Sequence, residues 1–202
     1  MRQWKVGPME NFVYLVSDGH AAALVDPAFD VPRLLELVAK EGVRVTHVLV
    51  THGHHDHIDG VPRVKQETGA QVIAHESADH APIDRRVRDG ETFLLGTIPI
   101  KVHHTPGHRF DSVCYQIGET HLLTGDTLFV GECGRVDLPG SSVPDMHRSL
   151  TQILPKLADE LVVLPGHDYG KTPTSTLGHE KAQNYTMKPR TLDEFVRFMR
   201  EP

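Results

Sequence analysis

The feature that most constrains this chain is a histidine-rich segment at residues 51–60, THGHHDHIDG. It places four side chains of metal-ligand type close together, namely His52, His54, Asp56 and His57. The apolar run just before it, VLV at residues 48–50, predicts a buried strand. Because a strand end is rigid and the loop after it can aim side chains, sites are often built at such places. The segment therefore indicates a metal site.

The same local arrangement occurs three more times along the chain. A short apolar strand is expected to end a few residues before His108, before Asp126 and before His167. Strand ends on one edge of a sheet can converge, which would bring five imidazoles and two carboxylates to one point. That set exceeds the four ligands of a tetrahedral zinc ion and is enough for two metals that share a carboxylate. Imidazole suits zinc and iron, and carboxylates offset their charge.

The composition limits the class of protein. With 202 residues, 39% hydrophobic and 24% charged, the sequence predicts one globular domain over residues 1–202. A formal net charge of −6 argues against nucleic acid as a partner. No apolar run approaches the roughly 20 residues of a membrane span, and no secretion signal is visible at the N-terminus. Two distant cysteines are typical of a reducing compartment, so we expect a cytoplasmic protein without membrane partners.

Apolar periodicity predicts strands that alternate with helices, which is the pattern of an α/β fold. The expected strands are residues 11–16, 21–25, 43–50, 71–74, 112–117, 121–123 and 161–164, with a further hairpin over 92–102. The expected helices are 30–42, 60–68, 143–157 and 191–199. Asp30 is expected to cap the first helix, and Gly42 to end it. Ser142 and Thr191 each precede an acidic residue by three positions, as in a capping box.

The four motifs also carry a family resemblance. THGHHDH at 51–57, TPGH at 105–108, GDT at 125–127 and PGH at 165–167 resemble, in the same order, the ligand motifs of the metallo-β-lactamase superfamily. The resemblance covers residues 11–199 and implies a four-layer αβ/βα sandwich with the metals at one edge, between the sheets. It implies two divalent ions, zinc first and iron or a mixed pair as alternatives. It implies that His52, His54 and His108 bind one ion, that Asp56, His57 and His167 bind the other, and that Asp126 bridges them.

Within that superfamily the sequence is most similar to two branches. GDTLF at residues 125–129 resembles the glyoxalase II-like thioesterases. CGRVD at 133–137 and GHDYG at 166–170 resemble the persulfide dioxygenases more, and also short one-domain relatives of glyoxalase II. The resemblance implies that Arg135 and Tyr169 contact an anionic part of the substrate. The alternatives are an ion pair of Arg135 with Asp137 and a packed aromatic ring at Tyr169. Asp168 is expected to orient a ligand histidine.

The leading hypothesis is a thioesterase that cleaves a small hydroxyacyl thioester. A metal-bridging hydroxide would attack the carbonyl, and Asp56 would orient or deprotonate the water. The second hypothesis is an iron-dependent persulfide dioxygenase that uses His52, His108 and Asp126, and the third is a non-catalytic metal-binding protein. The expected partner is a small-molecule thioester or persulfide, and a homo-oligomer is compatible with the sequence. Residues 184–187, NYTM, lack the arginine that contacts glutathione in the persulfide dioxygenases, so the thiol carrier stays open.

Overall fold

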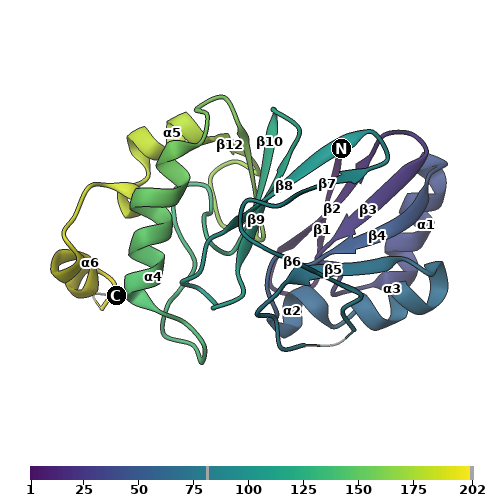
Figure 1. Cartoon of the computed structure of the whole chain (residues 1–202), viewed down its shortest axis with the longest axis horizontal. Coiled ribbons are helices and arrows are strands. Elements are labelled where there is room, and N and C mark those ends of the chain that lie inside the picture. Colours follow the sequence, from purple (N-terminus) through teal and green to yellow (C-terminus); the bar gives the residue numbers. More distant parts are fainter. Residues whose placement is uncertain (81, 201–202) are drawn as a thin grey trace.

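The computed structural model describes residues 1–80 and 82–200. Two six-stranded sheets face each other, and helices cover their outer sides (Figure 1). The first sheet has the order β1 (Arg2–Val6), β2 (Asn11–Ser17), β3 (Ala21–Val25), β4 (Arg44–Leu49), β5 (Gln71–His75), β6 (Arg85–Val87). The second has the order β12 (Ser175–Thr176), β11 (Val162–Pro165), β10 (His121–Gly125), β9 (Val113–Ile117), β8 (Ile98–His104), β7 (Thr92–Leu95).

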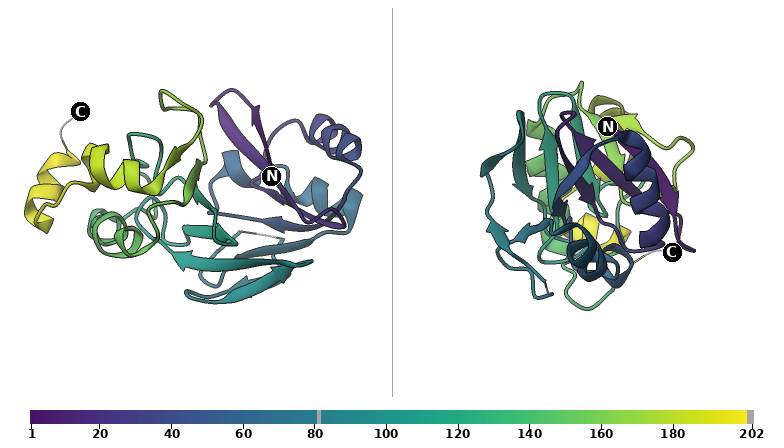
Figure 2. Two further views of the ribbon diagram at one scale, coloured as in Figure 1. Left: turned by 90° about the horizontal axis from the view of Figure 1, so that it is seen from above. Right: turned by 90° about the vertical axis from the view of Figure 1, so that its right-hand side faces the viewer.

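The helices form two groups, one on each side of the sheet pair (Figure 2). Those of the N-terminal half are α1 (Val31–Glu41), α2 (His55–Ile58) and α3 (Val61–Thr68). Those of the C-terminal half are α4 (Val143–Arg148), a π-helical turn η1 (Ser149–Ile153), two 3-10 turns η2 (Leu154–Lys156) and η3 (Tyr185–Met187), α5 (Leu177–Gln183) and α6 (Leu192–Phe198). The structure thus confirms the α/β sandwich.

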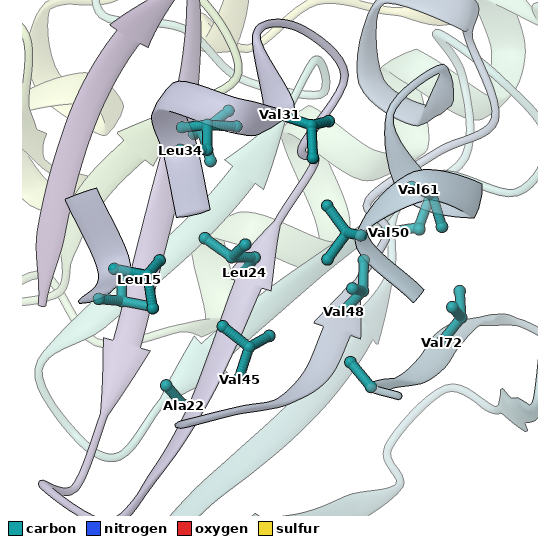
Figure 3. Packing of buried hydrophobic residues seen from close by; sticks show 14 of the residues in the cluster. Leu15, Ala22, Leu24, Val31, Leu34, Val45, Val48, Val50, Val61 and Val72 are labelled. Carbon is teal, nitrogen blue, oxygen red and sulfur yellow. The ribbon is translucent and has the colours of Figure 1, made fainter. Parts of the chain in front are cut away.

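Strand β2 shows how the sequence builds the layers. Successive side chains of a strand point to opposite faces. Phe12 and Tyr14 accordingly enter the core between the sheets, and Val13 and Leu15 enter the core under α1 and α3. Figure 3 shows that second core, where helix residues such as Leu34 meet the sheet. A strand buried on both faces reads as a continuous apolar run, as this one does.

Most predicted elements are present, with a few corrections. Gly42 ends α1 with φ 68°, and Thr191 forms the predicted capping box. Asp30 was expected to cap α1, but its side chain makes no capping bond and its backbone is left-handed, with φ 49°. The helix predicted over 143–157 widens into η1 just before Pro155, which has no N–H and whose ring crowds the preceding turn.

Six elements were not predicted, namely β1, β6, β12, α2, α5 and the 3-10 turn η3. The strands are short or lie at sheet edges, so they carry little alternation. Helix α5 buries Leu177 but is otherwise mostly polar, so its apolar period is weak. None of the helices within the two described ranges has the length and apolar character that spanning a bilayer requires.

Candidate metal centre and active site

Four loops bring the predicted ligands together in one cluster. The segment after β4 carries His52, His54, Asp56 and His57, and the last two lie on the short helix α2. The loops after β8, β10 and β11 deliver His108, Asp126 and His167. Strand β4 belongs to the first sheet and the other three strands to the second. The site therefore forms where two sheet edges meet, as the family resemblance implied, and not along one sheet.

The first group, which we name triad 1, consists of His52, His54 and His108. The Nδ1 atom of His54 lies 3.1 Å from Nε2 of His52 and 2.8 Å from Nε2 of His108. The rings of His52 and His108 are buried, whereas that of His54 is half-buried. Three ring nitrogens thus point at one another across a space the size of a metal ion.

The second group, triad 2, consists of Asp56, His57 and His167. The Nε2 atoms of the two histidines lie 3.2 Å apart. Oδ2 of Asp56 lies 3.4 Å from Nε2 of His57 and 3.3 Å from Nε2 of His167. Asn11 fixes this carboxylate, because its Nδ2 donates to Asp56 Oδ2 at 2.9 Å. Triad 2 therefore combines two imidazoles with one oriented carboxylate.

Asp126 lies between the triads. Its Oδ2 is 3.2 Å from Nε2 of His167 in triad 2 and 3.6 Å from Nε2 of His108 in triad 1. Its Oδ1 is 3.4 Å from Nε2 of His57, yet it is buried without a hydrogen-bond partner. A carboxylate buried in this way is costly unless a cation or a proton compensates it. Asp126 is placed to contact both groups at once.

Protein groups orient four of the five imidazoles. The second ring nitrogen, Nδ1, contacts Thr51 Oγ1 for His52 (3.1 Å), Asp26 Oδ2 for His57 (3.0 Å), the Arg135 carbonyl for His108 (2.8 Å) and the Met9 carbonyl for His167 (2.8 Å). Carbonyls and carboxylates only accept, and the Thr51 hydroxyl already donates to Asp26. In the neutral imidazoles Nδ1 therefore carries the proton, and the Nε2 lone pairs face the centre.

The sequence reading did not identify Asp26. Its carboxylate is buried and accepts hydrogen bonds from Thr51 N at 2.8 Å and Thr51 Oγ1 at 2.5 Å, in addition to its contact with His57. It follows β3 directly and has φ 51°, a left-handed conformation that is uncommon outside glycine. The rule that found the other residues, an acid or histidine just after an apolar strand, would have found it too.

The two triads differ in how they hold protons. Burial lowers the pKa of His52, and it lowers that of His54 to about 4. Burial also opposes protonation of His167, but Asp126 and Asp56 outweigh it and raise the pKa to about 9. The pKa of His57 is raised in the same way, chiefly by Asp126 against burial. His52 and His54 of triad 1 thus favour the neutral ring, and the histidines of triad 2 favour the protonated one when no other cation is present.

These observations fit divalent cations. Lone pairs on several imidazoles converge, and an unpartnered carboxylate oxygen lies between them. Ligand atoms bound to one ion at about 2.0–2.1 Å lie roughly 3 Å apart, which is the separation of the nitrogens within triad 1. All seven predicted ligands belong to this cluster. His55, His103 and His104 point elsewhere and contact Asp59, Gln116 and the Phe110 carbonyl.

A cavity of about 510 Å³ opens beside the cluster, and both predicted substrate contacts line it. The guanidinium of Arg135 donates to both carboxylate oxygens of Asp137 at 2.6 Å. The ring of Tyr169 stacks on that of His167, with centroids 4.7 Å apart and planes 13° apart. The prediction for Asp168 is wrong, because its carboxylate pairs with Lys5 at 3.1 Å and the Met9 carbonyl orients His167 instead.

The family model for the metallo-β-lactamase superfamily matches residues 6–168, and the chain belongs to this superfamily. The fold of that family binds divalent metals, and the histidines and aspartates described above form a suitable cluster in this chain. Within the family, relatives among sequences and structures place the chain in the glyoxalase II/ETHE1-like branch.

Two relatives support this placement, and a third is similar in sequence and fold. The hydroxyacylglutathione hydrolase of Methylobacterium nodulans is 40% identical over 166 residues, which cover 76% of this chain but only 64% of that protein. The crystal structure of ETHE1 from Myxococcus xanthus superposes with a TM-score of 0.92 at 32% identity, covering 99% of this chain and 89% of that one. TTHA1623 in a di-iron-bound form has a TM-score of 0.79 at 29% identity, with 92% and 99% covered.

Proposed function

We propose that the chain is a metal-dependent hydrolase, and specifically a thioesterase that cleaves a small hydroxyacyl thioester. The observation that carries this proposal is the position of Asp126, whose carboxylate contacts both triads and so suits a centre of two metals. His52, His54 and His108 would hold one ion, Asp56, His57 and His167 the other, and Asp126 would contact both. Zinc is the first choice of metal, and iron or a mixed pair is the alternative.

Two ions at this site would supply hydroxide near neutral pH and polarise the substrate carbonyl. The residues of the chain do the rest. Asp56 is held by Asn11 and borders the cavity, so its Oδ2 can orient a water or take its proton. Burial opposes ionisation of Asp56, but hydrogen bonds from His167 and His57 outweigh it and keep the pKa of its carboxyl well below the usual range. Asp56 is therefore an ionised acceptor at neutral pH.

The substrate would enter through the cavity. Its walls include the apolar side chains of Met9, Phe129 and Leu138, which suit the carbon skeleton of a small acyl group and exclude water. Tyr169 and Arg135 at its rim remain the predicted contacts for the thiol carrier. The name of the Methylobacterium relative supports an acylated thiol as substrate.

The structural match to ETHE1 favours a second candidate, a persulfide dioxygenase. This activity would need one iron on two histidines and a carboxylate, here His52, His108 and Asp126. All three residues of triad 2 would then be dispensable for binding the iron. The two candidates therefore make different demands on His167, and that residue separates them.

The test begins with the protein purified without added metal, in which zinc and iron are measured by mass spectrometry. Hydrolysis of lactoyl thioesters is followed by absorbance, and oxygen uptake is followed with a low-molecular-weight persulfide. A thioesterase releases thiol from the ester, consumes no oxygen and holds two metals per chain. Oxygen consumption with a persulfide, iron at one per chain and no ester hydrolysis would replace the first proposal by the second.

The variant His167→Ala gives the sharper comparison. A two-metal thioesterase loses its second metal and nearly all activity, whereas a one-iron dioxygenase keeps its iron and a large share of its oxygen uptake. His121→Ala is the matched control, because this histidine lies at the start of β10, at the other end of the strand that leads to Asp126. Loss of activity in both variants would indicate misfolding and not loss of a ligand.

A further inference from the structure

One acidic side chain at the exit of the cavity has no role in the metal centre. Glu132 lines the 510 Å³ cavity, and it also lines a wider neighbouring groove of about 1000 Å³. Tyr169 is the other residue common to both spaces. A substrate with its reactive end at the metals and its tail in the groove therefore passes between Glu132 and Tyr169.

Hydrogen bonds from both sides hold Glu132 in place. Its backbone carbonyl accepts from Phe129 N at 2.8 Å and from Asn184 Nδ2 at 3.1 Å. In the side chain, Oε1 accepts from the Cys133 amide at 3.0 Å, and Oε2 accepts from the Tyr185 hydroxyl. The buried side chain of Asn184 anchors this loop to the C-terminal helices. The carboxylate is thus a fixed feature of the cavity wall.

The charge of Glu132 is not compensated by the chain. Across residues 1–80 and 82–200, no lysine, arginine or histidine forms an ion pair with it. The side chain is half-buried, and burial raises the pKa of its carboxyl. Arg135, the arginine of the cavity, is already paired with Asp137. Lys171 lines the groove but not the cavity.

The ionised form of a half-buried carboxylate is less stable when all its hydrogen-bond donors are neutral than when a cation is paired with it. Among the described residues that line the cavity there is no lysine, and the one arginine, Arg135, would have to leave Asp137 to bind an anionic group. Its outer wall therefore carries one unpaired negative charge, at the point where the thiol carrier must lie. This negative charge favours thiol carriers with a cationic group at this point and disfavours carriers with an anionic group there.

We propose that Glu132 is a specificity residue, which binds an ammonium or other cationic group of the thiol carrier and disfavours carriers with a carboxylate there. The proposal rests on the proposed function, because it assumes that a carrier-linked substrate reaches the metal centre through this cavity. The α-ammonium of glutathione is one such group, and so is the amine of a smaller aminothiol. The shared chemistry is a cationic group of the carrier that reaches Glu132 while the acyl group lies at the metal centre.

The test uses metal-loaded protein and lactoyl thioesters of three small thiols: thiocholine (cationic), N-acetylcysteamine (neutral) and 3-mercaptopropionate (anionic). We expect kcat/KM to fall in that order, by roughly tenfold from cation to anion, which is the size of one screened charge contact. In Glu132→Gln the ratio of cation to anion drops to about a third or less of the wild-type ratio. Intrinsic ester reactivity cancels when the two proteins are compared. Added salt reduces the wild-type ratio and leaves that of the variant unchanged.

Two further variants control the result. Glu119→Gln removes an exposed acid in the turn between β9 and β10 and leaves the ratio as in the wild type. Tyr185→Phe removes the hydroxyl donor but keeps the carboxylate, so the order of the three esters is retained. Lactoyl thioesters of glutathione and of N-acetylglutathione show whether the tripeptide ammonium uses Glu132, since acetylation then lowers kcat/KM only in the wild type.

Binding of the three S-methyl thioethers, measured by calorimetry, separates this proposal from the thioesterase proposal. Charge-ordered binding that Glu132→Gln abolishes, without hydrolysis of any ester, supports the role of Glu132 and rejects the thioesterase. Hydrolysis of all three esters with equal preference, or an unchanged ratio in Glu132→Gln, overturns the role of Glu132 and leaves the thioesterase standing.

Discussion

The two triads share Asp126 as a neighbour but differ in chemistry. Triad 1 contains only imidazoles, and burial depresses the pKa of His52 and His54. Triad 2 contains a carboxylate, and a second one, Asp26, lies behind His57. In triad 2 the pKa of both histidines is raised. The comparison teaches that His52 and His54 of triad 1 can bind a cation at neutral pH without losing a proton, whereas the histidines of triad 2 must exchange protons for one.

The largest effect is expected when the residue between the triads is removed. Asp126→Ala leaves both triads without their common carboxylate, so we expect fewer than two metals per chain. We expect kcat/KM to fall by more than about 1,000-fold, as when one member of a catalytic unit is lost. Metal content and thioester hydrolysis are measured on the same sample. Full activity in a variant that has lost its metal would show that the proposed mechanism is wrong. The exposed Asp30→Asn serves as control, because its side chain makes no capping bond.

The pH dependence of metal binding tests the difference between the triads directly. The pKa of His167 is raised to about 9, so below pH 9 a metal entering triad 2 must displace a proton. Each displaced proton weakens apparent affinity about tenfold per pH unit, hence about 100-fold between pH 9 and pH 7 for His167 alone. The raised pKa of His57 adds to this loss. The pKa of His54 is lowered to about 4, so its ring stays neutral over that range. Equilibrium dialysis against buffered zinc should show the second equivalent weakening while the first holds. If the affinities for the first and the second zinc equivalent fell equally, the proposed difference between the triads would be wrong.

The same comparison shows what the sequence could predict. The seven cluster residues were predictable because each follows a short apolar strand within a few positions. The residue type alone indicates a site at these positions, because packing of the fold does not require so many histidines at strand ends. The fold followed from the same strands and from their alternation with helices. The capping box at Thr191 and the terminal glycine of α1 are equally local and were predicted.

What orients the cluster was harder to predict, because much of it is backbone. The backbone carbonyls of Met9 and Arg135 orient His167 and His108. Every residue has a carbonyl, so the sequence does not show which ones make such contacts. Asn11 comes from a strand far from the motifs along the chain, so only the folded sheets bring it near. Asp26 follows an apolar strand as the ligands do, but its contact with His57 also depends on the fold. The charge of Glu132 was likewise visible as a residue type, but its lack of an ionic partner depends on tertiary structure.

The next effect concerns the support behind the triads. Asp26→Asn keeps the shape of the side chain but removes the charge that faces His57, so we expect the affinity of triad 2 for its metal to fall about 10–100-fold. Thr51→Val removes the acceptor of His52 and should weaken triad 1 instead. Zinc titrations with a competing chromophoric chelator give the two affinities. Thr51→Ser, which retains the hydroxyl, is the control. If Asp26→Asn and Thr51→Val each lowered the metal affinity of both triads equally, Asp26 and Thr51 would support the two triads jointly. The two metal sites would then not be independent.

The smallest effect is expected at Tyr169, whose ring lies against His167 on the cavity side. Tyr169→Ala removes the stacking, which contributes about 0.5–1.5 kcal/mol in aromatic pairs, so triad 2 should bind its metal roughly 2–10-fold more weakly. Triad 1 makes no such contact and should be unaffected. Tyr169→Phe keeps the ring and should leave metal affinity within about twofold. If Tyr169→Phe lowers kcat/KM tenfold at unchanged metal affinity, the hydroxyl contacts substrate, because it is the one group that this variant removes. In that case the ring of Tyr169 stabilises metal binding at triad 2, and its hydroxyl binds the thiol carrier.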